Sequence, residues 1–249
     1  MVTARTERPD VRAVRQRAAR GRVVGQPSSW PGPFRAGPTP RPAAGLLLSL
    51  IASSILAAGA ACSPPVRQLP HPQAVAAERA AKDEYFGRAA DSPIPPETRG
   101  EFLPLAYFPV DASYVTGATL APSEREPAME MPTSTGQRRL MRRAGTLKFS
   151  LKDRPLALTA FVEAEAADER RLFVPFGDMT NGTETYAAGR YLDLQRSASG
   201  LYEIDFNRAY QPYCYYNPTY DCPYPPAENR LRLPIRAGER MRAPVRAAR

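Results

Sequence analysis

The sequence predicts a mostly-β domain, an antiparallel sandwich or a partly closed barrel, with one N-terminal helix after a disordered, exported leader. Apolar and polar residues alternate through most of residues 146–162, which indicates strands with one apolar face. Further short alternating stretches are separated by Gly and Pro, and one stretch near residue 80 has the composition of a helix. Many short strands with a single helix are typical of these two architectures.

The leader is strongly basic. The first 61 residues hold nine Arg against one Glu and one Asp, so most of the formal net charge of +9 lies there. Residues 1–44 show no apolar period, which predicts a disordered leader, either a long export n-region or the product of a mis-assigned start codon. Because the basic residues lie in tails rather than among aromatic residues, no nucleic-acid partner is expected.

An uncharged apolar segment follows the basic leader. Residues 45–61, GLLLSLIASSILAAGAA, become rich in small residues and end immediately before Cys62. With Arg35 and Arg41 upstream, this is the layout of a bacterial export signal. We therefore expect an exported protein at the extracytoplasmic face of the cell membrane or the outer membrane.

Three routes of attachment or release fit this signal. The segment resembles a lipoprotein signal in which Cys62 is lipidated, so that the chain is held at the membrane by a lipid anchor, although Gly59 stands where that pattern has Leu. Cleavage after Ala58-Gly59-Ala60 is one alternative. An uncleaved signal anchor is the other, because the uncharged segment is just long enough to span a bilayer.

The next segments predict a tether and then a helix. Residues 62–73, CSPPVRQLPHPQ, form a proline-rich tether, and the single histidine, His71, lies within it. Chemistry that needs a histidine inside the domain, such as a Ser-His-Asp triad or a His-ligated metal, is therefore not expected. Residues 74–88 predict one amphipathic helix, with Val75, Glu78 and Arg79 in its first turns.

Strands fill the rest of a single domain over residues 74–240, which a basic tail follows at residues 241–249. The clearest feature is a hairpin: residues 146–151 alternate, Lys152-Asp153 mark a turn, and residues 156–162 alternate again. Shorter strands are expected at residues 114–120, 137–144, 171–176, 191–194, 201–206 and 231–235.

Two cysteines, Cys214 and Cys222, enclose seven residues. In an exported chain they are a disulfide candidate, which would leave Cys62 for the lipid, and closing so short a loop would stabilise by about 2.5 kcal/mol. The alternatives are a pair of buried free thiols or a zinc site. Zinc would need four ligands at close spacing, which this region does not offer, so no metal site or cofactor is expected.

Two polar stretches hold the candidate site. Residues 204–231 contain six of the twelve tyrosines and five prolines, and residues 178–193 are dense in ionisable and Thr side chains around glycine turns. We expect these stretches to fold together around one cleft, roofed by Tyr210, Tyr213 and Tyr215. The alternative is a buried structural network that satisfies the loops' own backbone groups. The catalytic candidates are Asp178, Glu184, Arg190, Asp205 and Glu228, and the ligand-binding candidates are Asn207, Tyr210, Tyr213 and Asn229.

The same stretches resemble a known family. FVPFGDMTNGTETYAAGRYLDL (residues 173–194), DFNRAYQPYCYYNPTYDCPYPPAENRL (residues 205–231) and AGE (residues 237–239) are similar to the domain-of-unknown-function family numbered 1684. The resemblance implies relatives that are exported and lipoprotein-like as well as cytosolic ones, and no established activity. Cytosolic relatives would keep such cysteines reduced, which argues against the disulfide. Further similar segments are DSPIP (residues 91–95) and AYFPVDASY (residues 106–114).

The sequence does not decide whether the protein is an enzyme. A binding or accessory role outside the cytoplasm is expected, with tyrosines stacking on a small molecule or a carbohydrate ring. The alternative is a His-independent hydrolase of a cell-envelope or carbohydrate substrate, in which carboxylates act as general acid and base and Arg190 holds an anion. Oxygen ligands of the same carboxylates could instead bind a hard cation such as calcium.

Overall fold

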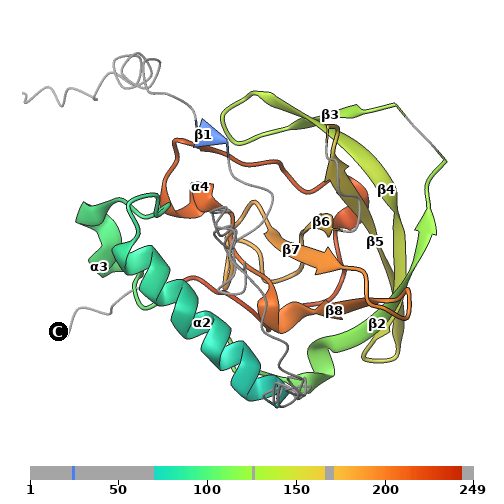
Figure 1. Ribbon diagram of the computed structural model, residues 1–249, viewed down its shortest axis with the longest axis horizontal. Coiled ribbons are helices and arrows are strands. Elements are labelled where there is room, and N and C mark those ends of the chain that lie inside the picture. The colour runs from blue at the N-terminus through green and yellow to red at the C-terminus, as the bar shows by residue number, and fades with distance from the viewer. Residues whose placement is uncertain (1–23, 26–69, 125–126, 166–170, 243–249) are drawn as a thin grey trace, which may run out of the picture.

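Seven strands hydrogen-bond into one antiparallel sheet that curls into a nearly closed barrel (Figure 1). The computed structural model describes residues 24–25, 70–124, 127–165 and 171–242. The strand order is β7-β6-β5-β4-β2-β8, with β3 paired to β4, and an antiparallel bridge between Arg196 and Tyr202 connects the ends of β7 and β8. The strands are β2 (Val115–Pro122), β3 (Met129–Pro132), β4 (Arg138–Leu151), β5 (Arg154–Glu163), β6 (Arg171–Phe176), β7 (Arg190–Gln195) and β8 (Tyr202–Asp205).

The remaining elements are short, apart from one helix. The helices are α2 (His71–Arg88), α3 (Arg99–Phe102) and α4 (Tyr213–Tyr216), and two short strands, β1 (Val24–Gly25) and β9 (Tyr220–Asp221), pair in parallel. None of the helices in the described ranges is long and apolar enough to cross a membrane. The predicted signal segment and Cys62 lie outside the described residues. Single 3-10 turns are η2 (Pro96–Thr98), η3 (Ala112–Tyr114), η4 (Phe206–Arg208) and η5 (Ala227–Asn229).

The fold class predicted from the sequence is confirmed, and the hairpin is its clearest part. β5 pairs along its whole length with the part of β4 from Met141 to Leu151, and Lys152 and Asp153 connect them with φ of 51° and 60°. Two consecutive left-handed residues form the hairpin turn whose twist matches that of the strands. The predicted strand at residues 137–144 is part of β4, which continues through an irregularity between Arg143 and Gly145.

The strand predicted at residues 231–235 is wrong. Its backbone groups bind a loop and side chains instead of a neighbouring strand: Leu231 N donates to Gly177 O at 2.8 Å, and Ile235 N donates to Asp178 Oδ1 at 3.1 Å. An extended chain with apolar residues therefore need not join a sheet. The brief strands β3 and β9 and the helix α4 have no clear periodicity and were not expected.

The sheet is apolar on both faces. Leu147, Leu158 and Leu192 belong to the core inside the barrel. On the outer face, Phe161, Phe173 and Tyr191 of the sheet pack with Tyr210, Cys214 and Cys222 of the tyrosine-rich segment. The part of this segment from Tyr210 to Cys222 is therefore a layer packed onto the sheet.

Helix α2 lies along one side of the barrel (Figure 1). It begins at His71, three residues earlier than expected, so the last part of the predicted tether is helical. Its buried residues are Val75, Lys82 and Phe86, so the expected apolar stripe is interrupted by a lysine. The Phe86 ring makes edge contacts with α4, with centroids 5.9 Å from Tyr213 and 5.7 Å from Tyr216. These contacts fix α2 against the layer that covers the sheet.

A glycine lets the C-terminal segment cross this layer closely. Gly238 has φ of 78°, and a Cβ there would lie 2.4 Å from Ala209 O and 2.7 Å from Phe206 O. Gly238→Ala should lower the free energy of unfolding by about 3 kcal/mol or more, because both the backbone angle and the contact resist a side chain. Urea denaturation measures this.

The matched control is Gly136→Ala. Gly136 has nearly the same φ, 80°, but a Cβ added there would meet nothing within 4 Å. Its cost should stay near 1 kcal/mol. Equal losses in the two variants would contradict the close approach at Gly238.

Candidate functional site

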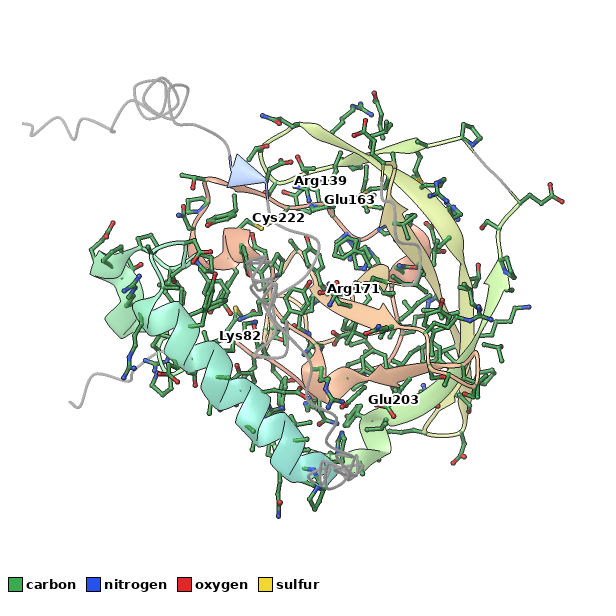
Figure 2. All side chains as sticks on the ribbon, viewed as in Figure 1. Lys82, Arg139, Glu163, Arg171, Glu203 and Cys222 are labelled. Atoms are coloured by element: carbon green, nitrogen blue, oxygen red, sulfur yellow. The ribbon has the colours of Figure 1, made fainter. Side chains whose placement is uncertain are left out.

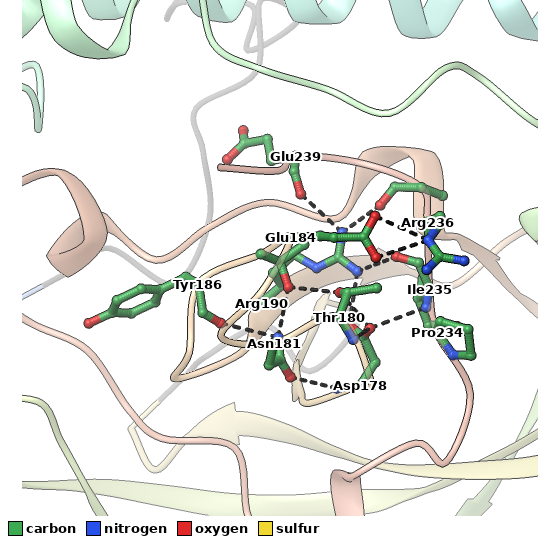
Figure 3. A network of polar contacts seen from close by, with 12 residues as sticks. Asp178, Thr180, Asn181, Glu184, Tyr186, Arg190, Pro234, Ile235, Arg236 and Glu239 are labelled. Atoms are coloured by element: carbon green, nitrogen blue, oxygen red, sulfur yellow. Dashed lines mark hydrogen bonds and ion pairs between the residues drawn. The ribbon is translucent and has the colours of Figure 1, made fainter. Parts of the chain in front are cut away.

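Two of the predicted catalytic residues, Asp178 and Arg190, form a completely buried ion pair (Figure 3). Arg190 Nη2 lies 2.9 Å from Asp178 Oδ2, and neither side chain is exposed. The same guanidinium donates to Ile235 O at 2.7 Å and to Glu239 O at 3.1 Å. Burial lowers the pKa of Arg190, and the neighbouring Asp178 opposes that shift. Arg190 therefore holds the C-terminal segment in place.

The loop before β7 completes this network. Asp178 Oδ1 accepts hydrogen bonds from the backbone amide and the hydroxyl of Thr180, at 2.8 and 2.6 Å. Glu184, another catalytic candidate, lies at the surface, where its carboxylate pairs with Arg236 at 2.9 Å. The structure thus places this group of predicted site residues in a structural network, the alternative that the sequence left open.

Asp205 and Asn207 lie together at the start of η4. The Asp205 carboxylate accepts the backbone amide and the side-chain amide of Asn207, both at 2.9 Å. The Asn207 amide then bonds both the N and the O of Asp111, each at 2.9 Å. Asn207 is therefore largely engaged in pinning the chain before η3 to the end of β8.

His71 also belongs to this group, which corrects its assignment to a tether. Its Nε2 lies 2.8 Å from Oδ2 of the buried Asp205, and the same oxygen accepts a hydrogen bond from Arg208. The domain therefore does contain a histidine beside a carboxylate. The sequence argument that excluded histidine chemistry was wrong in its premise, because helix α2 starts early enough to include His71.

Asn229 and Glu228 lie apart from the other candidates. The buried Asn229 amide bonds the N and O of Thr159 on β5, at 2.7 and 2.8 Å, and also Pro175 O at 2.7 Å. Glu228 is exposed and pairs with Arg143 at 3.1 Å. Asn229 therefore ties η5 to β5 and β6, and the predicted convergence of all the candidates on one cleft is wrong.

The two polar stretches do pack together, as expected. Tyr191 and Tyr210 exchange backbone hydrogen bonds at 2.9 and 3.0 Å, and the Tyr186 amide donates to Gln211 Oε1 at 3.0 Å. Tyr213 is buried against Phe86, and Tyr215 packs against Phe102. The two stretches, residues 178–193 and 204–231, together form a surface that faces α2 and is called the wall below.

Cys214 and Cys222 are both buried, and no disulfide joins them in the structure. The amide nitrogen of Cys214 lies 3.1 Å from Cys222 Sγ, so the two residues are neighbours. The hydrogen bond between the thiols lowers the pKa of Cys214, whereas burial raises that of Cys222. A bridge between them stays a prediction. Among the described residues, no group of three or more His, Cys, Asp or Glu is placed to hold a metal ion.

A pocket of about 430 Å³ lies between α2 and the wall. Figure 2 labels two of its lining residues, Lys82 on α2 and Arg171 on β6. Two of the predicted ligand-binding residues, Asn207 and Tyr210, line it, whereas Tyr213 and Asn229 do not. The lining residues are Val75, Glu78, Arg79, Lys82, Tyr107, Arg171, Asp193, Gln195, Asn207, Arg208, Ala209, Tyr210 and Glu239.

Ion pairs build the sides of this pocket. Lys82 Nζ bonds the carboxylate of Glu239, whose other oxygen accepts the Gln211 amide and the Tyr216 hydroxyl, both at 2.8 Å. Arg208 forms a two-pronged pair with Glu78, at 2.8 and 3.1 Å. These pairs hold α2 to the wall at two positions along the helix, Glu78 and Lys82.

The side chains of Arg79 and Tyr107 stack against each other in the pocket. The Arg79 guanidinium carbon lies 4.4 Å from the centroid of the Tyr107 ring, and its terminal nitrogens donate to Phe108 O and Asn207 O at 3.0 and 3.1 Å. Burial lowers the pKa of Arg79. Burial, followed by the charge of Glu239, raises the pKa of Tyr107, so its hydroxyl stays protonated.

Sequence reasoning missed most of the α2 side of this pocket. The signal was present: Arg79 and Lys82 stand four and seven residues after Val75, the helical spacing that leads on to Phe86, so charged residues occupy positions of the buried face. Long side chains at such positions indicate a partly polar interface. Tyr107 and Glu239, which come from distant segments, had no comparable signal.

The comparisons with known proteins agree with the fold. The family model described as "Protein of unknown function (DUF1684)" matches residues 100–240, so the chain belongs to this family. A solution NMR structure of an uncharacterized protein from Haloarcula marismortui is similar, with 38% identity and a TM-score of 0.55. The match covers 68% of this chain and 92% of that one. No curated protein matches the chain significantly.

The buried ion pair should contribute to stability, and the exposed one should not. Arg190→Met leaves Asp178 buried without its counter-ion and should lower the free energy of unfolding by about 3–5 kcal/mol. Glu184→Gln removes an exposed pair with Arg236 and should cost at most about 1 kcal/mol. Urea denaturation compares the two, and a small loss in Arg190→Met would contradict the structural assignment.

Proposed function

We propose that the protein is an extracytoplasmic binding protein that takes up a small molecule in the pocket between α2 and the tyrosine-rich wall. The pocket itself carries this proposal. Its volume of about 430 Å³ falls in the range of roughly 300–1,000 Å³ that is common for small-molecule sites. It also combines aromatic rings, at Tyr107 and Tyr210, with charged groups that could orient a ligand.

Binding is favoured over hydrolysis by the state of the carboxylates. Asp178 is closed inside its network with Arg190, and Glu184 and Glu228 pair with arginines at the surface. The carboxylates in the pocket are engaged too, Glu239 by Lys82, Glu78 by Arg208 and Asp193 by the hydroxyl of Tyr210. A general acid or base needs an oxygen that reaches the reacting group, and these oxygens are held by protein donors.

The proposed location rests on the leader. An apolar segment before Cys62, with arginines upstream, supports export followed by lipid attachment at that cysteine. A pocket on an anchored domain would then meet ligands outside the cytoplasm. The pocket and the leader support the two halves of the proposal independently.

A ligand in the pocket should raise the melting temperature of the full chain. A compound present at about 100 times its Kd stabilises by about 2.7 kcal/mol, which corresponds to a shift of about 5 °C or more for a domain of this size. Thermal-shift screening with a library of small organic molecules tests this. Gln195→Trp, which places a large ring on an exposed lining residue, should remove the shifts.

The control is Gln137→Trp, the same change at an exposed position of the β3–β4 turn outside the pocket lining. It should leave every shift in place. The binding role would be refuted if no compound bound, or if Gln195→Trp bound all compounds as well as the unmodified chain did.

Cys62 should decide how the chain is attached. With lipidation, the mature chain partitions into the membrane fraction and carries a mass increment of acyl groups at its first residue. Cys62→Ser should remove that increment and release the chain from the membrane fraction on processing. Mass spectrometry of fractionated cells measures both, and an identical mature mass with and without an inhibitor of lipoprotein processing would argue against the lipid.

A further inference from the structure

The charged groups that line the pocket do not balance. Among the described residues, the lining contains four cations and three carboxylates, so one positive charge is in excess. Lys82 is paired with Glu239, and Arg208 is paired with Glu78. The four cations are Arg79, Lys82, Arg171 and Arg208, and the three carboxylates are Glu78, Asp193 and Glu239.

Arg79 is a cation of this lining without an ion pair among the described residues. Arg171 lies at the exposed edge of the pocket. Arg79 is half-buried, and within the described part of the chain no carboxylate oxygen lies within ion-pair distance of it; its two terminal nitrogens donate to backbone carbonyls. A guanidinium held by carbonyls keeps its full charge, so its field is directed at whatever occupies the pocket.

Two buried donors near this charge lack acceptors. The Nε of Arg79 and the hydroxyl of Tyr107 are both buried, and neither has a hydrogen-bond partner among the described residues. The guanidinium stacks 4.4 Å from the Tyr107 ring centroid, so the two side chains are in direct contact. A buried donor without an acceptor is unfavourable, and a charged acceptor gives the strongest bond to such donors.

We propose that the pocket recognises a monoanionic organic ligand, a carboxylate, through Arg79 and Tyr107; this inference rests on the pocket being the ligand-binding site. One guanidinium without an ion pair, held by two backbone carbonyls, matches one negative charge. A phosphate monoester would bring a second negative charge beside Glu78, Asp193 and Glu239, where Lys82 and Arg208 are already paired with carboxylates. The rings of Tyr107 and Tyr210, with Val75 and Ala209, would contact the apolar body of the ligand.

The test compares head groups on a fixed body. Benzoate, benzamide, benzylamine and phenyl phosphate, and the same four head groups on a hexyl chain, are titrated into the full chain by isothermal calorimetry. At least one carboxylate should bind about tenfold or more tightly than its amide, amine and phosphate counterparts. The inference would be overturned if, on both the aromatic and the hexyl body, the amide, the amine or the phosphate bound as tightly as the carboxylate or more tightly.

Tyr107→Phe separates recognition from structure. The variant keeps the ring under Arg79 and removes a hydroxyl that has no described partner, so its melting temperature should stay the same or rise. Carboxylate affinity should fall about tenfold, while neutral compounds bind as before. Tyr224→Phe, at an exposed tyrosine outside the lining, is the matched control and should change neither. Unchanged carboxylate affinity in Tyr107→Phe would overturn the role of the hydroxyl.

Arg79 variants complete the test. Arg79→Gln should abolish carboxylate binding, and Arg79→Lys, which keeps the charge but loses the planar donors, should restore part of it. If Arg79→Gln fails to fold, Tyr107→Phe still decides. Failure of this inference is distinct from failure of the binding role: neutral or cationic compounds would then bind, and Gln195→Trp would block them, whereas no compound would bind if the binding role itself were wrong.

Discussion

The carboxylate of Glu239 is the interaction on which the arrangement of this molecule depends. It is 2% exposed, and it receives Lys82 from α2, the backbone amide of Gln211 and the hydroxyl of Tyr216. The backbone of the same residue donates to Ala209 O and accepts from Arg190. One residue therefore joins the helix, the tyrosine-rich segment and the buried Asp178–Arg190 pair. Burying a charge is costly, and the charge persists here because each oxygen has charged or strongly polar donors.

The pocket is a consequence of that connection. An amphipathic helix with an ordinary apolar stripe would pack flat on the layer that covers the sheet and leave no space. On the inner face of α2 the two cations Arg79 and Lys82 lie between apolar Val75 and Phe86. Their long side chains reach the wall through carbonyl contacts and an ion pair. The helix is thereby held at a distance, and the gap is lined by the groups that hold it.

The difference between local patterns and contacts that join distant segments explains what could be predicted from the sequence. The strands of the barrel other than β3, and the turn at Lys152-Asp153, follow from local periodicity and turn chemistry, and the structure agrees with them. The partners of Asp178, Asn229 and Glu239 could not be predicted in this way, because each joins segments far apart in the chain; Lys82 and Glu239 are separated by 157 residues. A polar residue in a loop has the same local pattern whether it pins a backbone, as Asn229 does, or lines a pocket, as Asn207 does in part. Only the three-dimensional partners distinguish the two roles.

The abundance of tyrosine follows from the position of the tyrosine-rich segment between the sheet and helix α2, and Tyr107 is an exception. A segment packed between a sheet and a helix needs rings on its apolar side and hydrogen-bond donors at its edges, and tyrosine supplies both. Tyr191 donates to Pro223 O, Tyr210 to Asp193 and Tyr216 to Glu239, so packing and hydrogen bonding account for these residues. Tyr107 contributes a buried ring but its hydroxyl has no partner in the described chain, and phenylalanine would satisfy its structural role at lower cost. Under the carboxylate proposal, this hydroxyl beside the Arg79 guanidinium would bond the ligand.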